Sequence, residues 1–465
     1  MAAQYIKAYI ILVFLHFTSV NAKELKFDET KFKESLAPAI QFRDHSAVFQ
    51  LQDRMKRYGA SGVSIAIVKN NDLIFTKAYG YIAKNSTVLV NEQTLFQAAS
   101  ISKPITALGI MHRLDGKKLS LDEPINNYLN SWKFNKGKPL TLRQLLSHTA
   151  GVNNASYSGY EQGAELPNLF DILNGIGELK AVKVELPIGQ YNYSGGGYSL
   201  LQLVIENVFK QSFSQFMHSE LFKTFNAPQS HFKIMDHSSK FNIAKGHGYS
   251  GNTYPSGWFN YPQKAAAGLW STPTDIANLL IAYMKSYQGV DSKMMSKEQA
   301  KEVATVVESK MGLGFGVHGK GIDLHIDHAG WNKGYRAYMV AFPELGDAVV
   351  VMANSNYSNR LIEEIMRSVS GQFEWDAYKS TKLTLANWKT SKFQELVGSY
   401  RFSKAGFSVE IYQVDNYLEL KTPRGTTHQL YPISKNSLVM LEDGAVIKVL
   451  ENGILNFWGM NAHKI

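Results

Sequence analysis

The sequence of 465 residues contains no cysteine. Disulfides, thiolate zinc sites, iron–sulfur clusters, a cysteine nucleophile and a lipid-modified N-terminal cysteine are therefore excluded. Charged residues make up only 19% of the chain, which argues against a coiled coil or a solvated linker protein. Apolar residues make up 45%, so the chain can bury a sizeable core. These absences leave a globular protein whose chemistry rests on side chains other than cysteine.

The chain has a modest excess of basic residues, 49 Lys and Arg against 39 Asp and Glu, which gives a formal net charge of +10. No block of basic residues of the nucleic-acid-binding type occurs, so we expect no nucleic-acid partner. The positive charge suits peripheral association with an anionic cell envelope. Beyond the N-terminus no apolar run reaches the roughly 18 residues of a membrane span, so we expect no transmembrane segment.

The first 22 residues have the pattern of a secretory signal peptide. Lys7 precedes an apolar run over residues 8–17, and Val20 and Ala22 occupy the two positions that a signal peptidase reads. The apolar run is too short for a membrane span of roughly 20 residues. We therefore expect a cleaved signal peptide at 1–22 and a periplasmic or secreted protein.

The order of the predicted elements favours an antiparallel sheet flanked by helices. β-rich runs at 63–68 and 73–79 surround an Asn-rich turn and predict a hairpin. Strands are predicted again at 335–342 and 348–353. The chain begins with strands, continues with helices and returns to strands. This order fits an α+β fold better than a fold built from alternating βαβ units. The predicted helices are 102–114, 141–147, 198–209, 272–283 and 361–369.

The pattern of the sequence changes after about residue 371. Short β-type runs follow one another, separated by Asp-Gly and Asn-Gly pairs that favour tight hairpin turns. This even spacing predicts a small all-β module, a barrel or a sandwich, over 392–465. Residues 372–391 are interpreted as the linker to a larger domain over 23–371.

A Ser-x-x-Lys sequence, Ser100 to Lys103, is the sharpest chemical feature. Residues three apart share one face of a helix, so Ser100 Oγ and Lys103 Nζ can meet. A serine hydroxyl needs a base to take its proton, and a lysine at its usual pKa of about 10.4 is protonated. Burial among apolar neighbours favours the neutral amine. Pro104 limits how far the helix extends upstream, which places Ser100 at the helix start, where backbone N–H groups stabilise an oxyanion.

A second candidate is Tyr193, in a polar, glycine-rich stretch interpreted as a loop that leads into a helix at Tyr198. A nearby lysine cation is expected to lower the pKa of its phenol from about 10 and make a phenolate base possible. The alternative is a flexible turn with a packing tyrosine, the commoner case in a chain with 24 tyrosines.

A third candidate is the stretch from His325 to Trp331. In a strand His325 and Asp327 face one way and His328 the other, so the three cannot chelate one ion, and we expect no metal. The alternatives are a polar edge strand, or a strand in which His328 points into a cleft that the Trp331 backbone N–H also faces. A dinucleotide-like glycine pattern at 314–319 is interpreted as chance, and His148 as structural.

These three candidate stretches occur in the order of the motifs of a known family. The chain resembles the serine β-lactamase-like superfamily, in the branch of class C β-lactamases, D,D-peptidases and related esterases. Residues 100–103 match its nucleophile motif, 193–195 fall at its Tyr-x-Asn motif, and 328–330 fall at its Lys-Thr-Gly motif in the His-x-Gly form. The likeness spans roughly 45–370. It implies a β-lactamase/transpeptidase-like α/β (α+β) fold, with a helical subdomain beside the antiparallel sheet. The C-terminal module looks like the small lipocalin-type barrel appended to some of these hydrolases.

The resemblance also implies roles for individual residues. Ser100 attacks a carbonyl and becomes acylated, Lys103 and Tyr193 share the proton transfers as a coupled pair, and water releases the acyl group. Backbone N–H groups of Ser100 and Trp331 form the oxyanion hole. No metal or organic cofactor is required. The residues placed at the oxyanion or the substrate are Ser100, Gly195, His328, Gly330 and Trp331.

Two departures from the family motifs bear on the substrate. Gly195 stands where the family has Asn, and His328 stands where it has Lys, with an ordinary pKa near 6.5. Both changes weaken recognition of a β-lactam or a peptide carboxylate. We therefore expect an exported serine hydrolase that forms an acyl-Ser100 intermediate with a small-molecule or peptide ester or amide. The alternatives are a D,D-carboxypeptidase, D-aminopeptidase or weak β-lactamase, and, in another class, a non-catalytic penicillin-binding sensor or binding module.

Overall fold

The computed structural model describes residues 26–43, 47–114, 118–130, 132–134, 139–423, 425–457 and 459–465. The predicted signal peptide, residues 1–22, lies outside this part of the chain. In the part that the structure describes, no helix is long and apolar enough to cross a membrane.

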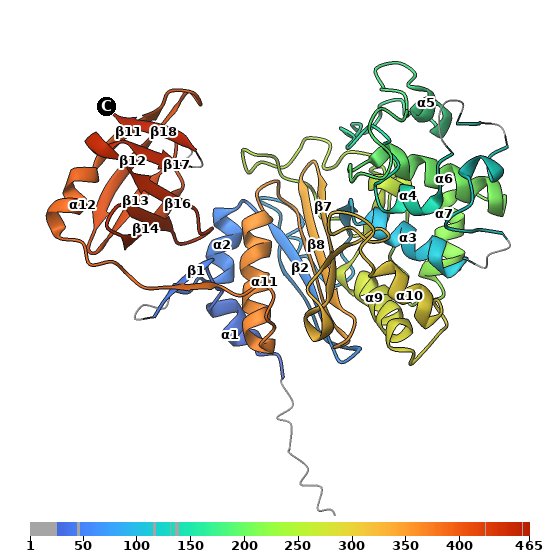
Figure 1. The fold of residues 1–465 in the computed structure, drawn as a ribbon, viewed down its shortest axis with the longest axis horizontal. Helices are drawn as coiled ribbons and strands as arrows, with labels where there is room; N and C mark the ends of the chain where they lie inside the picture. The colour runs from blue at the N-terminus through green and yellow to red at the C-terminus, as the bar shows by residue number, and fades with distance from the viewer. Residues whose placement is uncertain are drawn as a thin grey trace, which may run out of the picture.

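A six-stranded antiparallel sheet in the order β3-β2-β9-β8-β7-β6 forms the centre of the larger domain (Figure 1). The predicted hairpin is present, and its turn places Asn70 and Asn71 at φ of 52° and 65°, a left-handed conformation that asparagine tolerates. Strand β9 pairs with its sequence neighbour β8 and also with β2, which lies far from it in the sequence. The strands are β2 (Gly62–Lys69), β3 (Asp72–Gly80), β6 (Gly316–His318), β7 (His325–Asn332), β8 (Tyr335–Phe342) and β9 (Asp347–Ala353).

Helices cover both faces of this sheet, as the sequence predicts (Figure 1). One face packs against α1 (Glu29–Glu34), α2 (Leu51–Arg57) and α11 (Asn359–Phe373). The other face forms the larger core together with the remaining helices of the larger domain. These helices are α3 (Ser102–His112), α4 (Leu142–Leu146), α5 (Leu169–Asn174), α6 (Gly195–Phe209), α7 (Phe213–Phe216), α8 (Lys264–Ala267), α9 (Pro273–Gln288) and α10 (Lys297–Val303), with a π-helical turn at Met217–Phe222.

Two local expectations are wrong. Helix α6 begins at Gly195, so Gly195 to Gly197 form its first turn rather than a loop before Tyr198. Ser194 caps this helix by accepting the Gly197 N–H at 2.9 Å, and the missing glycine side chains let the neighbouring backbone approach. The polar edge strand, one of the two alternatives for the stretch from His325 to Trp331, is also wrong for the first part of β7, because the short strand β6 pairs with residues 325–327.

The C-terminal module is a closed antiparallel barrel of eight strands, which confirms the predicted barrel. The stretch interpreted as a linker contains a short strand, β10 (Thr381–Leu383), which pairs in parallel with β1 (Ile40–Phe42). This pairing ties the segment before the barrel to the start of the larger domain. The barrel follows α12 (Thr390–Leu396) and consists of β11 (Gly398–Phe402), β12 (Phe407–Val414), β13 (Tyr417–Lys421), β14 (Thr427–Ser434), β15 (Ser437–Met440), β16 (Val446–Val449), β17 (Leu455–Phe457) and β18 (Met460–Lys464).

Candidate active site

Ser100 lies in a sharp turn between strand β4 (Phe96–Ala99) and the start of α3. Ala99 has a φ of 53°, a left-handed conformation that is uncommon for a residue with a side chain. Ser102 fixes this turn, since its hydroxyl donates to the Ala99 carbonyl at 2.5 Å and accepts the Leu269 N–H at 3.0 Å. Leu269 begins β5 (Leu269–Ser271), the partner strand of β4. The nucleophile candidate is therefore held between two strands and a helix.

Lys103 reaches Ser100 as the motif spacing predicts. Its Nζ lies 3.2 Å from Ser100 Oγ and 2.8 Å from the Ala266 carbonyl oxygen, and the residue is only 2% exposed. Burial lowers the pKa of Lys103 to about 7, because an ammonium loses its hydration there. The Ala266 carbonyl can accept one amine hydrogen, which leaves the lone pair of the neutral amine free to accept the Ser100 proton.

Tyr193 lies beside Lys103, whose Nζ is 4.8 Å from the centre of the tyrosine ring. Burial raises the pKa of Tyr193 to about 12, and its hydrogen bond with Ser100 opposes only part of that rise. The expectation of a lowered phenol pKa is therefore wrong, because the same burial that neutralises the lysine also disfavours a phenolate. At neutral pH Tyr193 is a protonated phenol next to the nucleophile, and thus a hydrogen-bond donor.

His328 completes this group from β7, with its ring centre 6.1 Å from that of Tyr193. Its Nδ1 donates to the Ala329 carbonyl at 2.7 Å, which leaves Nε2 as an acceptor in the neutral ring. Burial, followed by the charge of Lys103, lowers the pKa of His328 to about 4. The site therefore has no cation at the position of the third motif at neutral pH.

Glycine lets β7 lie directly against the turn of the nucleophile. A Cβ built on Gly330 would meet the Ala98 carbonyl oxygen at 2.2 Å, so a side chain there would push β7 away from β4. Trp331 follows on the same strand, but its side chain is 62% exposed and stacks on the Arg336 guanidinium at 4.1 Å. Because Trp331 is three residues from His328 in a strand, its side chain points to the opposite face, and we expect its backbone rather than its side chain to face the site.

Gly195 is buried in the first turn of α6 and contributes no amide to the site. A Cβ at this position would meet the ring of Tyr157 at 2.9 Å, so the space of an asparagine side chain is already filled. The structure therefore brings Ser100, Lys103, Tyr193 and His328 together, and leaves Gly195 as a packing position.

His148 is a supporting residue, and no pattern in the sequence connects it with Tyr193. Its ring centre lies 4.4 Å from that of Tyr193 and 5.3 Å from that of Tyr198. Its Nδ1 accepts the backbone N–H of Ser194 at 3.0 Å, which holds the backbone next to Tyr193. Burial lowers the pKa of His148 well below its ordinary value, so the ring is neutral. His148 packs between the two tyrosines and fixes the position of Tyr193.

The histidine-rich strand forms no metal centre. His318 Nε2 lies 3.4 Å from Asp327 Oδ1, and Asp327 also accepts the Tyr338 hydroxyl at 2.5 Å. Across the described ranges, no group of three or more His, Asp or Glu side chains is arranged to hold a metal ion.

A sequence model of the beta-lactamase family matches residues 50–367 of this chain. The chain belongs to the beta-lactamase family. Over 318 residues this beta-lactamase-family chain is 25% identical to "Protein flp" of Staphylococcus aureus strain NCTC 8325, an alignment that covers 65% of the chain and 62% of flp. The chain therefore spans less than two thirds of the length of that relative.

Two solved structures show the same fold. The octameric penicillin-binding protein homologue from Pyrococcus abyssi superposes with a TM-score of 0.60 at 20% identity, covering 89% of this chain and 98% of that one. The D-amino acid amidase from Ochrobactrum anthropi SV3 superposes with a TM-score of 0.56 at 21% identity, covering 70% of this chain and 97% of that one. The β-lactamase/transpeptidase-like fold expected from the ordered motifs is confirmed.

Proposed function

We propose that this beta-lactamase-family protein is a serine hydrolase that works through an acyl-Ser100 intermediate on an ester or amide without a carboxylate beside the scissile bond. The observation that supports it most is the 3.2 Å contact between Lys103 Nζ and Ser100 Oγ, combined with a pKa of Lys103 lowered to about 7. A serine at hydrogen-bond distance from a half-neutral amine is an activated nucleophile.

In this mechanism neutral Lys103 accepts the Ser100 proton as Oγ bonds to the carbonyl carbon. The carbonyl oxygen gains the negative charge, and the backbone N–H groups of Ser100 and Trp331 are assigned to stabilise it. The leaving alcohol or amine takes a proton from Tyr193, which regains one from the Lys103 ammonium. Water then adds to the acyl carbon and gives its proton to the same pair. The pair returns a proton to Ser100 Oγ as the bond between Oγ and the acyl carbon breaks and the acid is released.

The substrate preference follows from what the site lacks. A substrate carboxylate would need a cation, and His328 is neutral at physiological pH since its pKa is about 4. Gly195 adds no amide contact. These features favour neutral esters and amides over D,D-peptides and β-lactams. The likeness to the amidase of Ochrobactrum anthropi supports testing D-amino acid amides beside esters.

The proposal includes export and a peripheral position at the cell envelope. The basic, apolar and small-residue order of residues 1–22 supports a signal peptide. A net charge of +10 supports contact with an anionic surface.

Mass spectrometry of the protein during turnover tests this function. The protein is mixed with a short p-nitrophenyl ester or a D-amino acid p-nitroanilide, quenched in acid and digested. We expect turnover together with a transient acyl group on the peptide that contains Ser100. A stoichiometric adduct that never turns over would instead identify a binding module, and the absence of both adduct and turnover would reject the hydrolase.

The pH dependence provides a second prediction. Only neutral Lys103 accepts the proton, so kcat/KM for a neutral ester should rise about tenfold per pH unit below its pKa of about 7 and level off above it. Tyr193, with a pKa of about 12, stays protonated over this range and causes no further rise. Initial rates from pH 5 to pH 9.5, corrected for the uncatalysed reaction, measure this profile. A rate that keeps climbing beyond about pH 9 would assign the proton transfer to an unperturbed lysine or to the phenol.

The third-motif position provides a substrate-switch prediction. His328→Lys places an amine at this position that a bound carboxylate can hold protonated, so acylation by a carboxylate-bearing β-lactam should accelerate by on the order of 10-fold, the usual gain from one charged hydrogen bond. His328→Gln, which fills similar space without charge, is the matched control. The second-order acylation rate with a chromogenic β-lactam measures the change. Equal rates in the two variants would show that charge at this position does not limit recognition.

A further inference from the structure

Arg336 on β8 is a buried arginine that lies directly beside Trp331 on β7. The two residues are register partners, and the central carbon of the Arg336 guanidinium lies 4.1 Å from the centre of the Trp331 ring. Register partners share one face of a sheet, so both side chains lie on the face opposite to His328. Arg336 is only 3% exposed, whereas the indole above it is 62% exposed. The exposed tryptophan therefore covers a buried cation.

The guanidinium of Arg336 also holds the turn between β7 and β8. Its Nη1 donates to the Tyr335 carbonyl oxygen at 2.7 Å. The same nitrogen lies 3.2 Å from the Asn332 carbonyl oxygen and 3.3 Å from Asn356 Oδ1. Because Asn332 directly follows Trp331, these contacts limit how the backbone at Trp331 can rotate.

The opposite face of β7 is held by β4, the strand that leads into the turn of the nucleophile. The Asn332 side chain donates to Gln97 Oε1 at 2.8 Å. A Cβ on Gly330 would meet the Ala98 carbonyl oxygen, so the two strands lie in direct contact. These contacts flank Trp331 in the sequence. Its backbone is thus held through its neighbours on one face and by the guanidinium on the other.

The positive charge of Arg336 has no carboxylate to balance it, since Arg336 forms no ion pair with any residue that the structure describes. The titratable neighbours that act on its pKa are the hydroxyls of Tyr249, Tyr254 and Tyr261, and a tyrosine hydroxyl carries no charge at neutral pH. Burial lowers the pKa of Arg336 to about 10, so the guanidinium stays protonated at neutral pH. An unpaired cation in the interior costs folding free energy, which a neutral side chain would avoid.

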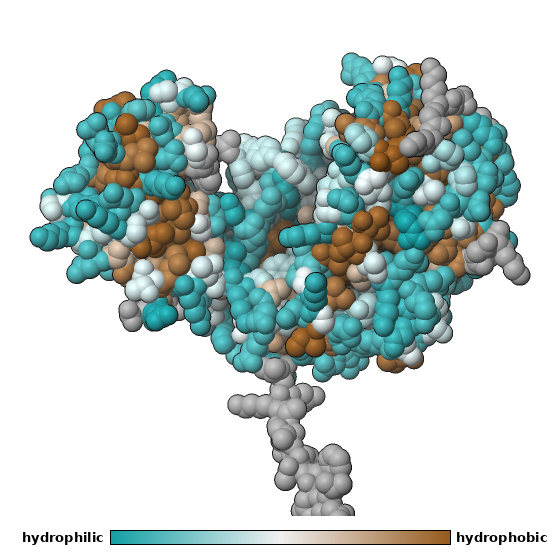
Figure 2. Space-filling view, viewed as in Figure 1, coloured by the Kyte–Doolittle hydropathy of each residue, from teal (hydrophilic) through white to brown (hydrophobic). Residues whose placement is uncertain are grey.

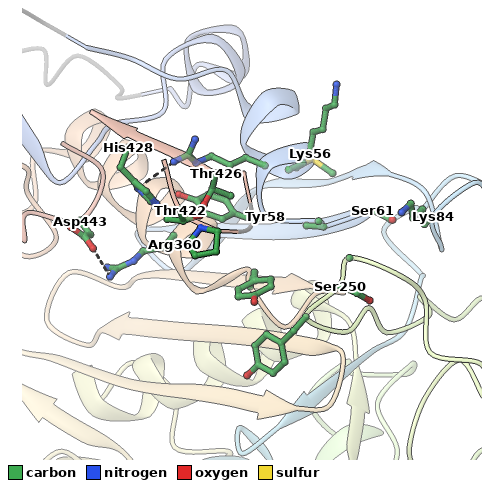
Figure 3. Close-up of a pocket in the computed structure, with 18 of the residues that line it drawn as sticks. Lys56, Tyr58, Ser61, Lys84, Ser250, Arg360, Thr422, Thr426, His428 and Asp443 are labelled. Carbon is green, nitrogen blue, oxygen red and sulfur yellow. Dashed lines mark hydrogen bonds and ion pairs between the residues drawn. The ribbon is translucent and has the colours of Figure 1, made fainter. Parts of the chain in front are cut away.

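The cavity between the barrel and the larger domain supplies no carboxylate to Arg336 either. The molecule is hollowed between these two parts (Figure 2), and Tyr249, the neighbour of Arg336, forms part of the wall. Among the described residues that line this cavity, the acidic one is Asp443, and its carboxylate lies 2.9 Å from Arg360 Nη2 (Figure 3). The charge of Arg336 therefore stays uncompensated on this side as well.

We propose that Arg336 is a positioning residue that holds the Trp331 N–H toward the carbonyl oxygen of the substrate, an inference that rests on the acyl-Ser100 mechanism. Arg336 does not touch the substrate, because its side chain lies on the other face of β7. It acts through Trp331, whose ring packs on the guanidinium and whose backbone is fixed by the bonds to the turn. The uncompensated charge adds positive potential behind this N–H, which favours the oxyanion over the neutral carbonyl of the bound substrate.

Steady-state kinetics with a neutral p-nitrophenyl ester, together with inhibition by phenylboronic acid, tests this role. A boronic acid bonds to the serine Oγ and places an oxygen where the oxyanion forms, so its affinity follows transition-state stabilisation. Arg336→Gln should lower kcat about tenfold, weaken the boronate by a similar factor and leave KM within about twofold. The pH at which kcat/KM levels off should not move, because Lys103 keeps its surroundings.

Further variants separate positioning from folding. Arg336→Lys keeps a cation beside the ring but loses the planar fork, so it should recover only part of the lost kcat. Trp331→Ala should lower kcat by a smaller factor than Arg336→Gln, and the double variant should lose little more than Arg336→Gln alone. The matched control is Arg54→Lys, at a buried arginine that pairs with Glu364, which should lower the unfolding temperature without changing kcat or boronate affinity.

Unchanged kcat and boronate affinity in the folded Arg336→Gln protein would overturn the inference, and so would a loss confined to KM. Trp331→Ala changes an exposed side chain, so it provides the same test if Arg336→Gln does not fold. Losses that multiply in the double variant would show that Arg336 does not act through Trp331. An unaltered protein that neither turns over the ester nor binds the boronate would instead reject the acyl-Ser100 mechanism itself.

Discussion

Replacing Ser100 with alanine is expected to lower kcat/KM for a neutral ester by on the order of 10⁴-fold or more. The remaining rate would come from substrate binding and oxyanion stabilisation alone. The loss should be this large because the two other serines that the structure places beside the site, Ser102 and Ser194, are held in hydrogen bonds of their own. Ser102 is bound to Ala99 and Leu269, and Ser194 donates to the Asn153 carbonyl while it caps α6. The measurement is ester turnover with the protein at high concentration, together with the mass of the quenched protein.

The matched control for this experiment is Ser403→Ala, at an exposed serine of the barrel. It should retain full activity and still form the acyl adduct. Ser100 is half-buried, so its alanine variant leaves no core cavity and should unfold at the same temperature as the natural protein. Full turnover by a folded Ser100→Ala protein would place the nucleophile outside this turn and reject the mechanism.

Replacing Lys103 with methionine is expected to lower kcat by on the order of 10³-fold and, at neutral pH, to stabilise the fold. The activity falls because the base is gone. The stability rises because folding lowers the pKa of Lys103 from about 10.5 to about 7. Between pH 7 and pH 10.5, Lys103 is protonated in the unfolded chain and neutral in the folded chain. The stability of the fold therefore falls as the pH drops from 10.5 to 7, and it is lowest below pH 7. Methionine has no charge and avoids this loss.

The expected gain follows from the size of the pKa change. A change of this size corresponds to on the order of 4 kcal/mol, of which about 1 kcal/mol is offset by the lost hydrogen bond to Ala266. Thermal unfolding at pH 6 and pH 10 measures it, and the advantage of the variant should shrink at the higher pH. Lys435→Met, at an exposed position, controls for the loss of one charge. A variant that is less stable than the natural protein at both pH values would contradict the burial of a costly charge.

The parts of the site that sequence alone predicts are those that local spacing determines. Ser100 and Lys103 are three residues apart at a helix start, and they meet wherever that helix packs. The hairpin of β2 and β3 and the barrel are local in the same sense, because their short turns join neighbouring strands.

The parts that sequence could not predict depend on elements far apart in the chain. The raised pKa of Tyr193 comes from burial by several helices and by β7, which its own segment does not reveal. The glycines at the start of α6 have the composition of a loop, and only their packing against Asn153 and Tyr157 explains why they are helical. The parallel pair of β1 and β10 has no local signature, since its strands lie at opposite ends of the sequence.

The pairing of β2 with β9 sets when the nucleophile can become active during biosynthesis. The Gly62 N–H donates to the Asn354 side chain at 2.7 Å, across 292 residues of sequence. A ribosome therefore releases Ser100 long before the strands that complete the sheet and bring β7 beside it. Non-local pairing of this kind forms late in folding. A growing chain consequently has Ser100 and Lys103 but not the β7 backbone beside them, so we expect it to carry no acylating activity until nearly the whole domain has been synthesised.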